Sequence, residues 1–332
     1  MRITRKEKNG VITLLIAVCT LIFGCSSDDD DYERGNWIRR SVFDGVPRSN
    51  AVSFTIDGLG FMGTGYDGDD YLNDFWAYHI DGDYWEQVAD FPGTPRSAAT
   101  GFTLDGLGYL GTGYDGNDEL SDFYSYNPGS NTWTKIADYG GGKRIAAVGF
   151  GINGYAYMGT GNDGENDKKD FYKYDPVDDQ WSELVGFGGE KRRYATSFII
   201  DDYVYMGTGV SNGLYTEDFW RFDPATETWS QLTDLDEEDD YYLTRSNAVS
   251  FSIDGMGYLS AGYNGGALTS TWEYDPLLDQ WEEITDLEAT VRQDAVSFST
   301  GSQAFVLMGR SGSLYLDDIY ELHPQEEYDE ED

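Results

Sequence analysis

The sequence predicts an all-β protein, a β-propeller of six four-stranded antiparallel blades, on three observations. An 18-residue unit, RSNAVSFTIDGLGFMGTG in its first copy, returns five more times at intervals near fifty residues. A two-residue hairpin turn recurs inside it, and a tryptophan precedes every copy. A regular period of this length is typical of propellers, in which each repeat supplies one blade. The six copies begin at Arg48, Arg96, Arg144, Arg192, Arg245 and Arg292.

The first copy shows how each repeat divides into four strands. Residues 51–56 are apolar at nearly every position, which predicts a strand covered on both faces. Asp57-Gly58 is a type I′ hairpin signal. A second strand over residues 59–62 runs into a Gly-Thr-Gly segment, a third follows at residues 74–78, and a fourth opens at Trp85.

Aromatic residues and glycines recur at fixed places in the later strands. The third strand carries blocks such as DFYSYNP and DFWRFDP, and the fourth opens with tryptophan. We expect these aromatics to fill the wedges between neighbouring sheets. One recurrent glycine indicates a position that needs positive φ or close backbone approach. The tryptophans are Trp85, Trp133, Trp181, Trp229 and Trp281; the glycines are Gly65, Gly113, Gly161, Gly209, Gly262 and Gly309.

The two ends of the chain are expected to share one blade. The last copy stops at Pro324 with no tryptophan strand after it. Trp37 lies eleven residues before Arg48, as Trp85 lies eleven before Arg96. The N-terminal strand therefore completes the last blade and removes exposed sheet edges. We expect the propeller to cover residues 36–324 and the acidic residues 325–332 to form a disordered tail.

The repeat resembles the kelch motif. The resemblance rests on the glycine-rich end of the second strand, the third strand with its aromatic, acidic and proline residues, and the tryptophan that opens the fourth strand. It covers residues 37–324. Gly-Thr-Gly stands where the family has a double glycine, so these are divergent copies. The resemblance implies a β-propeller, in agreement with the period.

The N-terminus predicts export as a lipoprotein. A basic segment is followed by the apolar residues 11–23 and by Cys25, which resembles a lipobox cysteine. We expect residues 1–24 to be a signal peptide, Cys25 to be lipidated and residues 25–35 to be an acidic linker similar to export tags of Bacteroidetes-type surface lipoproteins. The alternative is an ordinary secretory signal or short anchor. The implied location is the outer membrane, surface-exposed, with a periplasm-facing orientation as the alternative.

Charge and cysteine content restrict the partners. The net charge is −39, which disfavours nucleic acid and anionic lipid surfaces, so membrane contact is expected only through the lipid. Cys19 and Cys25 are the chain's only cysteines, and both precede the repeats. The folded part therefore lacks disulfides and thiolate metal sites. We expect a monomer that binds a protein or glycan.

The candidate site is the face that bears the connections between blades and the long loops between the second and third strands of each blade. The six leading arginines, Arg48, Arg96, Arg144, Arg192, Arg245 and Arg292, lie there, flanked by Lys143, Lys191 and Arg193. A ring of guanidinium groups suits carboxylate or sulfate ligands, because the planar fork binds two oxygens at once. The alternative is structural ion pairing with Asp74, Asp122, Asp170, Asp218 and Asp318.

Metal and cofactor signals are weak. The acidic loops at residues 66–74, 114–122 and 162–170 have oxygen ligands suited to Ca²⁺, but none matches an EF-hand, and solvated loops are the favoured interpretation. His79 and His323 occupy one repeat position and are interpreted as turn residues rather than a metal pair. No cofactor is expected.

Two functions remain open at this point. The first is a cell-surface lipoprotein that recognises a protein or a glycan, including anionic glycans, through the loop-bearing face. The alternative is an exported carbohydrate isomerase or epimerase, because six-bladed exported kelch proteins include an N-acetylneuraminate epimerase. No catalytic residue can be assigned, so binding is favoured over catalysis. The copper galactose oxidase type is excluded, because its modified cysteine-tyrosine pair has no counterpart cysteine in the repeats.

Overall fold

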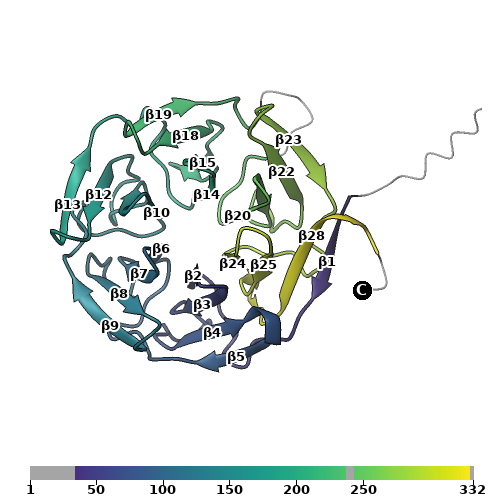
Figure 1. Ribbon diagram of the computed structural model, residues 1–332, viewed down its shortest axis with the longest axis horizontal. Helices are drawn as coiled ribbons and strands as arrows, with labels where there is room; N and C mark the ends of the chain where they lie inside the picture. Colours follow the sequence, from purple (N-terminus) through teal and green to yellow (C-terminus); the bar gives the residue numbers. More distant parts are fainter. Residues whose placement is uncertain (1–33, 237–242, 330–332) are drawn as a thin grey trace, which may run out of the picture. The chain divides into compact units, whose positions relative to one another are not determined.

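The computed structural model describes residues 34–236 and 243–329, which form a ring of six four-stranded antiparallel sheets (Figure 1). The expected signal peptide, Cys25 and most of the linker lie outside the described residues. Within the described part, no helix is long and apolar enough to cross a membrane. The predicted six-bladed all-β propeller is therefore confirmed.

Each of blades 1 to 3 is a meander whose strands pair in chain order. Blade 1 comprises β2 (Val52–Ile56), β3 (Leu59–Gly63), β4 (Phe75–His79) and β5 (Tyr84–Gln87), with the 3₁₀ turn η1 (Ile80–Gly82) before β5. Blade 2 comprises β6 (Thr100–Leu104), β7 (Leu107–Gly111), β8 (Phe123–Asn127) and β9 (Thr132–Ile136). Blade 3 comprises β10 (Val148–Ile152), β11 (Tyr155–Gly159), β12 (Phe171–Asp175) and β13 (Gln180–Leu184).

Blades 4 and 6 each carry an extra small hairpin in the loop between their second and third strands. Blade 4 comprises β14 (Thr196–Ile200), β15 (Tyr203–Gly207), β18 (Trp220–Asp223) and β19 (Thr228–Gln231), with the hairpin β16 (Val210–Ser211) and β17 (Leu214–Tyr215). Blade 5 comprises β20 (Val249–Ile253), β21 (Met256–Ser260), β22 (Thr271–Asp275) and β23 (Gln280–Ile284). Blade 6 comprises β24 (Val296–Ser299), β25 (Ala304–Leu307), β28 (Ile319–Glu327) and β1 (Arg34–Arg39), with the hairpin β26 (Arg310–Ser311) and β27 (Leu314–Tyr315).

The two ends of the described chain close the ring as predicted. In Figure 1 the purple β1 lies beside the yellow β28, and Trp37 pairs with Leu322 across the two strands. The pairing of β1 with β28, called the clasp below, is longer than expected, because Arg34 pairs with Glu327 and the amide of Asp329 donates to Asn36 Oδ1 at 3.2 Å. Residues 325–327, which the sequence placed in a disordered tail, are therefore strand, and strand β1 begins two residues before the expected boundary.

Aromatic side chains fill the space between successive blades. Trp133 of blade 2 packs edge-on against Phe75 of blade 1, with ring centroids 5.0 Å apart, and its Nε1 donates to the carbonyl oxygen of Ala89 at 2.9 Å. Trp181 of blade 3 packs on Phe123 of blade 2 in a tilted arrangement, with ring centroids 5.5 Å apart. These contacts lie between blades rather than within them, as the repeated tryptophans predicted. Burial of this apolar surface is the main force that holds the ring closed.

The hairpin turns between first and second strands have the predicted geometry. Asp57 and Gly58 both have positive φ, 50° and 78°, as a type I′ turn requires. Such turns are only two residues long, so they leave this side of the ring with little material for a site. The opposite side carries the long loops and is called the loop face below.

Candidate binding face

The six leading arginines lie inside the blades, with no exposed surface. The guanidinium group of Arg96 donates to the two carboxylate oxygens of Asp122 at 2.6 and 3.0 Å and to the carbonyl oxygen of Thr112 at 2.9 Å. In blade 5, Ser270 stands at the aspartate position, and Arg245 donates to its Oγ at 3.0 Å. The corresponding ion pairs in other blades are Arg48–Asp74, Arg144–Asp170, Arg192–Asp218 and Arg292–Asp318.

Each of these ion pairs lies within a single blade. It joins the entry of the first strand to the start of the third, and an aromatic ring often covers the guanidinium plane, as Phe91 does for Arg96 at 4.8 Å. The arginines that the sequence put forward for ligand binding are thus engaged by the fold itself. Their geometry is that of the structural alternative, and the expected ring of accessible guanidinium groups is absent.

The ion pairs also set the charge of the aspartates. Burial of Asp74 opposes its ionisation, but hydrogen bonds from Arg48 and Trp76 outweigh this and hold the pKa of its carboxyl group below the usual value. In blade 5, where Ser270 replaces the aspartate, burial lowers the pKa of the Arg245 guanidinium to about 10. The carboxylate and the guanidinium therefore stabilise each other's charged forms.

Two closed circles of backbone hydrogen bonds join the blades at the loop face. In the outer circle, the glycine after each second strand donates to the carbonyl oxygen of the leading arginine of the next blade, as Gly65 does to Arg96 at 2.7 Å. This glycine has φ of 101°, and a Cβ there would lie 2.9 Å from the carbonyl oxygen of Ser49. The recurrent glycines thus mark close approach with positive φ, as predicted.

The inner circle surrounds the mouth of the central channel and is called the collar. Each collar residue donates its amide to the carbonyl oxygen of the collar residue in the preceding blade, at 2.9 to 3.3 Å, and the first closes on the last. All six have φ between 50° and 59°. The collar comprises Asn50, Ala98, Ala146, Tyr194, Asn247 and Asp294.

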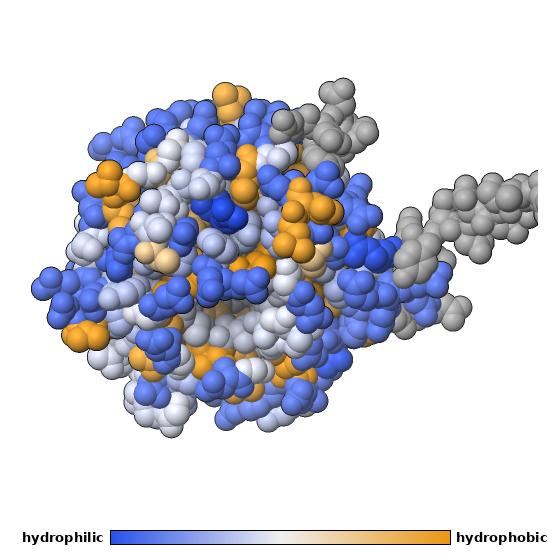
Figure 2. Space-filling model, turned by 45° about the horizontal axis from the view of Figure 1, so that its top comes forward, coloured by the Kyte–Doolittle hydropathy of each residue, from blue (hydrophilic) through white to orange (hydrophobic). Residues whose placement is uncertain are grey.

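Polar side chains gather on one half of the collar. Asn50, Tyr194, Asn247 and Asp294 line a cavity of about 180 Å³ whose remaining wall is alanine. Asn247 Nδ2 donates to Asp294 Oδ1, which fixes this pair across neighbouring blades. Figure 2 shows a hollow near the centre of the ring from one side. A concave mouth with a few convergent polar groups is the usual form of a small-molecule site.

Two partly exposed arginines border this mouth. Arg310 Nε donates to Asp294 Oδ2 at 2.8 Å, and Arg193 Nη1 donates to Asp167 Oδ1 at 2.7 Å. Each arginine side chain is 34% exposed, whereas each aspartate side chain is 2% exposed. The buried carboxylate therefore positions a guanidinium group whose remaining donors can reach solvent or a ligand.

The charges of Asp294, Arg193 and Arg310 act on the hydroxyl group of Tyr194. Burial, and then the negative charge of Asp294, raise the pKa of Tyr194 to about 12, while Arg193 and Arg310 act in the opposite direction. At neutral pH this tyrosine is a protonated donor, and Asp294 and the arginines lie within electrostatic range of it. The mouth can therefore offer both donors and acceptors to a ligand.

Comparison with known proteins agrees with this architecture. A family model of the kelch motif matches residues 113–138. The solved structure of YjhT is similar with a TM-score of 0.73 over 83% of this chain and 95% of that chain, at 18% sequence identity. The chain is a six-bladed β-propeller that carries a kelch motif at residues 113–138. No curated protein matches it, and at this identity the likeness to YjhT concerns the fold.

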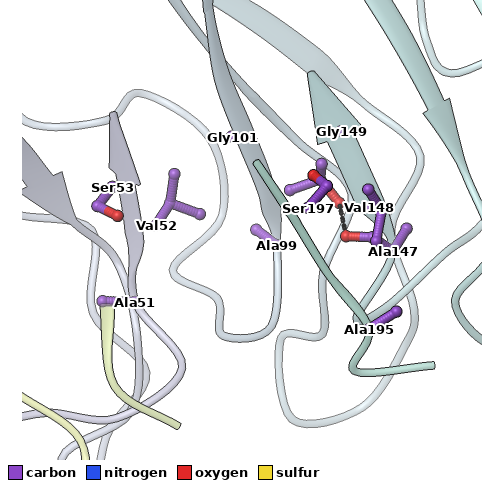
Figure 3. A pocket seen from close by; sticks show the side chains of 11 residues that line it. Ala51, Val52, Ser53, Ala99, Gly101, Ala147, Val148, Gly149, Ala195 and Ser197 are labelled. Carbon is purple, nitrogen blue, oxygen red and sulfur yellow. Dashed lines mark hydrogen bonds between the residues drawn. The ribbon is translucent and has the colours of Figure 1, made fainter. Parts of the chain in front are cut away.

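The channel of the propeller is lined by small side chains. Residues 51–56 were expected to be covered on both faces, but alternate positions of the innermost strands border the channel, as Ser53 and Gly101 do in Figure 3. Several channel hydroxyl groups donate to a backbone carbonyl of the preceding blade in the ring; Ser53 Oγ of blade 1, for example, donates to the carbonyl oxygen of Ser297 of blade 6 at 2.9 Å. Beyond the mouth the channel widens to a cavity of about 500 Å³. Its lining provides polarity but no acid, base or nucleophile pair.

Four tyrosines form an arc on the loop face of the propeller, over blades 6, 1 and 2. The ring centroids of Tyr315 and Tyr66 are 6.2 Å apart, those of Tyr66 and Tyr71 are 4.9 Å apart, and those of Tyr71 and Tyr114 are 5.9 Å apart. All four are partly exposed. Because Tyr315 also lies within electrostatic range of Arg310 and Asp294, the arc begins beside the mouth. We call these four residues the tyrosine arc.

The acidic loops of the propeller bind their own backbone. Asp67 Oδ1 accepts hydrogen bonds from the amides of Asp69 and Asp70 at 2.9 and 2.7 Å, and Asp115 and Asp163 do the same in blades 2 and 3. Such turns fold the loop and occupy carboxylate oxygens. Across residues 34–236 and 243–329, no group of three or more His, Cys, Asp or Glu residues has the arrangement to hold a metal ion.

The two histidines lie apart from the mouth and have local partners. His79 Nε2 lies 3.0 Å from Glu86 Oε2, and His323 Nδ1 lies 3.2 Å from Glu326 Oε1. His79 stacks on Tyr84 directly before the η1 turn, with ring centroids 4.2 Å apart. His79, at the end of β4 directly before η1, matches the interpretation as a turn residue, whereas His323 lies inside strand β28 and pairs with Asn36, so that interpretation is wrong for His323.

Sequence reasoning named Arg193 only as a neighbour and overlooked the rest of the mouth. Tyr194, Asn247 and Asp294 occupy the position at which Ala98 and Ala146 stand in blades 2 and 3. Arg310 occupies a position at which three other repeats have tyrosine. The sequence signal that could have indicated these site residues is therefore a residue that departs from the repeat consensus at a position on the loop face.

Proposed function

We propose that this kelch propeller is a binding module that recognises a glycan on the loop face, over the channel mouth and the tyrosine arc. The observation that carries the proposal is the placement of four partly exposed tyrosines next to a concave mouth with donors and acceptors. Sugar rings have apolar faces that pack on aromatic rings, and their hydroxyl groups need hydrogen-bond partners. Tyrosine supplies a rigid surface with a polar tip at low entropic cost.

The partly exposed guanidinium groups of Arg193 and Arg310 extend this proposal to acidic glycans. Each is already oriented by a buried aspartate, so little side-chain freedom is lost when a ligand binds. An arginine that shares its charge with one carboxylate retains donors on its other nitrogens. Arg193 and Arg310 can therefore bind a sugar carboxylate at the mouth while the six buried arginines keep their structural ion pairs and hydrogen bonds.

The test is a glycan array with the purified protein, with sialic and uronic acids included, followed by calorimetry on the hits. Tyr71→Ala should weaken binding of an array hit at least tenfold, because one ring of the arc is lost. Tyr84→Ala is the matched control, since Tyr84 is 50% exposed and follows η1 at the opposite face. Equal affinities for both variants and the unmodified protein would remove the arc from the site.

A second candidate function is a carbohydrate isomerase or epimerase of the N-acetylneuraminate epimerase type. One observation favours it: the Tyr194 hydroxyl and the Asp294 carboxylate, a potential acid and base, share the mouth with two arginines. Proton transfer of this kind needs such a group within reach of the sugar. The assay is NMR of N-acetylneuraminate and related sugars with catalytic amounts of protein. Turnover that is lost in Tyr194→Phe would favour the enzyme, and binding without turnover would favour the module.

We also propose that the module is displayed at the cell surface on a lipid attached to Cys25. The support is the basic and apolar N-terminal sequence with its lipobox-like cysteine and the acidic residues that follow. A single lipid chain binds a bilayer only marginally, so stable anchoring requires multiple acylation. The propeller would then face the medium and act as a receptor.

A further inference from the structure

A second cleft, of about 630 Å³, lies on the loop face between blades 3 and 4. Three segments form its walls: residues 167–170 from the long loop of blade 3, residues 190–191 from the connection into blade 4, and residues 211–212 from the β16–β17 hairpin. Its volume is within the range of small-molecule sites. It is separate from the collar and the tyrosine arc, although Asp167 links it to Arg193 at the mouth.

Lysines are concentrated in this cleft. The whole chain has eight lysines and a net charge of −39, yet Lys168, Lys169 and Lys191 all line this one cleft. Cationic side chains are thus gathered at one point of a strongly anionic protein. Cationic groups in a cleft raise the local concentration of anions where the neighbouring carboxylates are neutralised by other cations.

The aspartates of the cleft have partners other than these lysines. Asp170 accepts both bonds of the Arg144 fork, at 2.7 and 2.9 Å. Asp167 accepts from Arg193 at 2.7 Å, from Asn162 Nδ2 at 2.8 Å and from the amide of Asn212 at 3.0 Å. Both carboxylates are therefore used by the fold. Glu190, at the cleft edge, is the one lining carboxylate without such partners among the described residues.

Two of the three lysines have no carboxylate within ion-pair distance in the described part of the chain. Lys168 pairs with Asp163. Lys169 Nζ makes only a long contact, 3.4 Å, to the carbonyl oxygen of Gly189, and Lys191 belongs to the connection into blade 4. Two lysines from different segments thus line one polar cleft together with Ser211 and Asn212.

We propose that this cleft binds the oxyanion groups of an acidic sugar, carboxylates of uronic acids or sulfate esters. Two ammonium groups in one cleft suit a ligand with two anionic groups, or one anionic group that contacts both. Long polyanions are disfavoured, because the rest of the surface is acidic and repels them. The proposal goes beyond glycan recognition at the mouth, since its residues, location and ligand charge are different.

The experiment is calorimetric titration of the full chain with trigalacturonate, which carries carboxylates, and with a chondroitin sulfate tetrasaccharide, which also carries sulfates. The arm that binds identifies the preferred oxyanion. The Lys169→Ala/Lys191→Ala variant should bind at least tenfold more weakly, and Lys169→Arg/Lys191→Arg should retain most of the affinity. The affinity of the unmodified protein should fall between 50 and 300 mM NaCl, because salt screens exposed charges.

The matched control is Lys135→Ala/Lys143→Ala, which removes the same charge from two exposed lysines outside the cleft. It should bind like the unmodified protein. Absence of binding to both probes, or an equal loss in this control, would overturn the proposal. Loss in Tyr71→Ala with intact binding in the Lys169/Lys191 variant would also overturn it, because the ligand would then lie on the tyrosine arc. Intact binding in Tyr71→Ala separates this site from the glycan site proposed above.

Discussion

Removal of the Asp122 carboxylate should destabilise the propeller, because it leaves a buried charge without its partner. Arg96 has no exposed surface and is held by two hydrogen bonds of 2.6 and 3.0 Å to that carboxylate. Breaking a buried ion pair from one side typically costs 3–5 kcal/mol. The Asp122 side chain is 22% exposed, so water can partly replace it, and we expect Asp122→Ala to lower the free energy of unfolding by about 2–3 kcal/mol.

Urea unfolding at equilibrium measures this loss, and a matched surface pair provides its control. In the Lys135–Asp138 pair both side chains are more than half exposed and 3.4 Å apart, so Asp138→Ala should cost less than about 1 kcal/mol. Asp122→Asn keeps an oxygen acceptor for Arg96 and should fall between the two variants. For a domain of this size, 2–3 kcal/mol corresponds to a lowering of the melting temperature by roughly 3–5 °C.

The result that would refute this reasoning is equal stability of Asp122→Ala and Asp138→Ala. It would mean that the guanidinium group of Arg96 finds compensating partners or water inside the blade. The arginine would then be free to meet a ligand without structural penalty, and its assignment as a structural residue would fail.

Three further predictions concern the closure of the ring by β1, the dependence of thermal stability on pH in the acidic range, and the lipid anchor. Trp37→Ala removes a side chain with no exposed surface and should cost about 3–5 kcal/mol in urea unfolding, whereas Tyr84→Ala should cost little; equal effects would contradict the clasp. The lowered pKa of Asp74 gives stability that is present above about pH 4 and is lost as the pH falls through its folded pKa, whereas the pKa of Glu217 is raised, first by the charge of Asp236, so that protonation of Glu217 relieves repulsion. The melting temperature should therefore rise as the pH is lowered from 7 to about 5 and then fall below about pH 4. A melting temperature that rises throughout this acidification would contradict the role of Asp74. Cys25→Ser should abolish the incorporation of labelled lipid and release the protein from the membrane fraction. If the protein with Cys25 in place also incorporates no labelled lipid, lipidation is contradicted.

The fold could be predicted because its determinants are local and repeated. Asp57-Gly58 specifies a turn by its own conformational preferences, and it recurs as Asp105-Gly106 in blade 2. The position of Trp37 relative to Arg48 predicted the clasp, since the segment around Trp37 was the one candidate for the fourth strand of the last blade. The length of β28 could not be foreseen, because Glu327 is strand only through its partner Arg34, nearly three hundred residues away.

The candidate site was harder to predict because it depends on where side chains point. The recurrence of an arginine and an aspartate 26 residues apart allowed both an anion site and an internal ion pair, and only the fold shows that Arg96 turns inward. Tyr194 and Asp294 come together from different blades through the collar, a relation that no spacing within one repeat contains. Lys168 and Lys169 lie in a loop that was interpreted as acidic, and their cleft exists only because blade 4 supplies Lys191.

The collar has a consequence for how the protein opens. Its six amides form a cycle, so each hydrogen bond is held in place by its two neighbours, and the cycle spans from Asn50 in blade 1 to Asp294 in blade 6. A linear array of repeats can fray from either end, one repeat at a time. A cycle has no end from which to fray, so collar amides should exchange with deuterium only when the ring opens as a whole. Their protection would then report the global free energy of unfolding and identify the propeller as one cooperative unit.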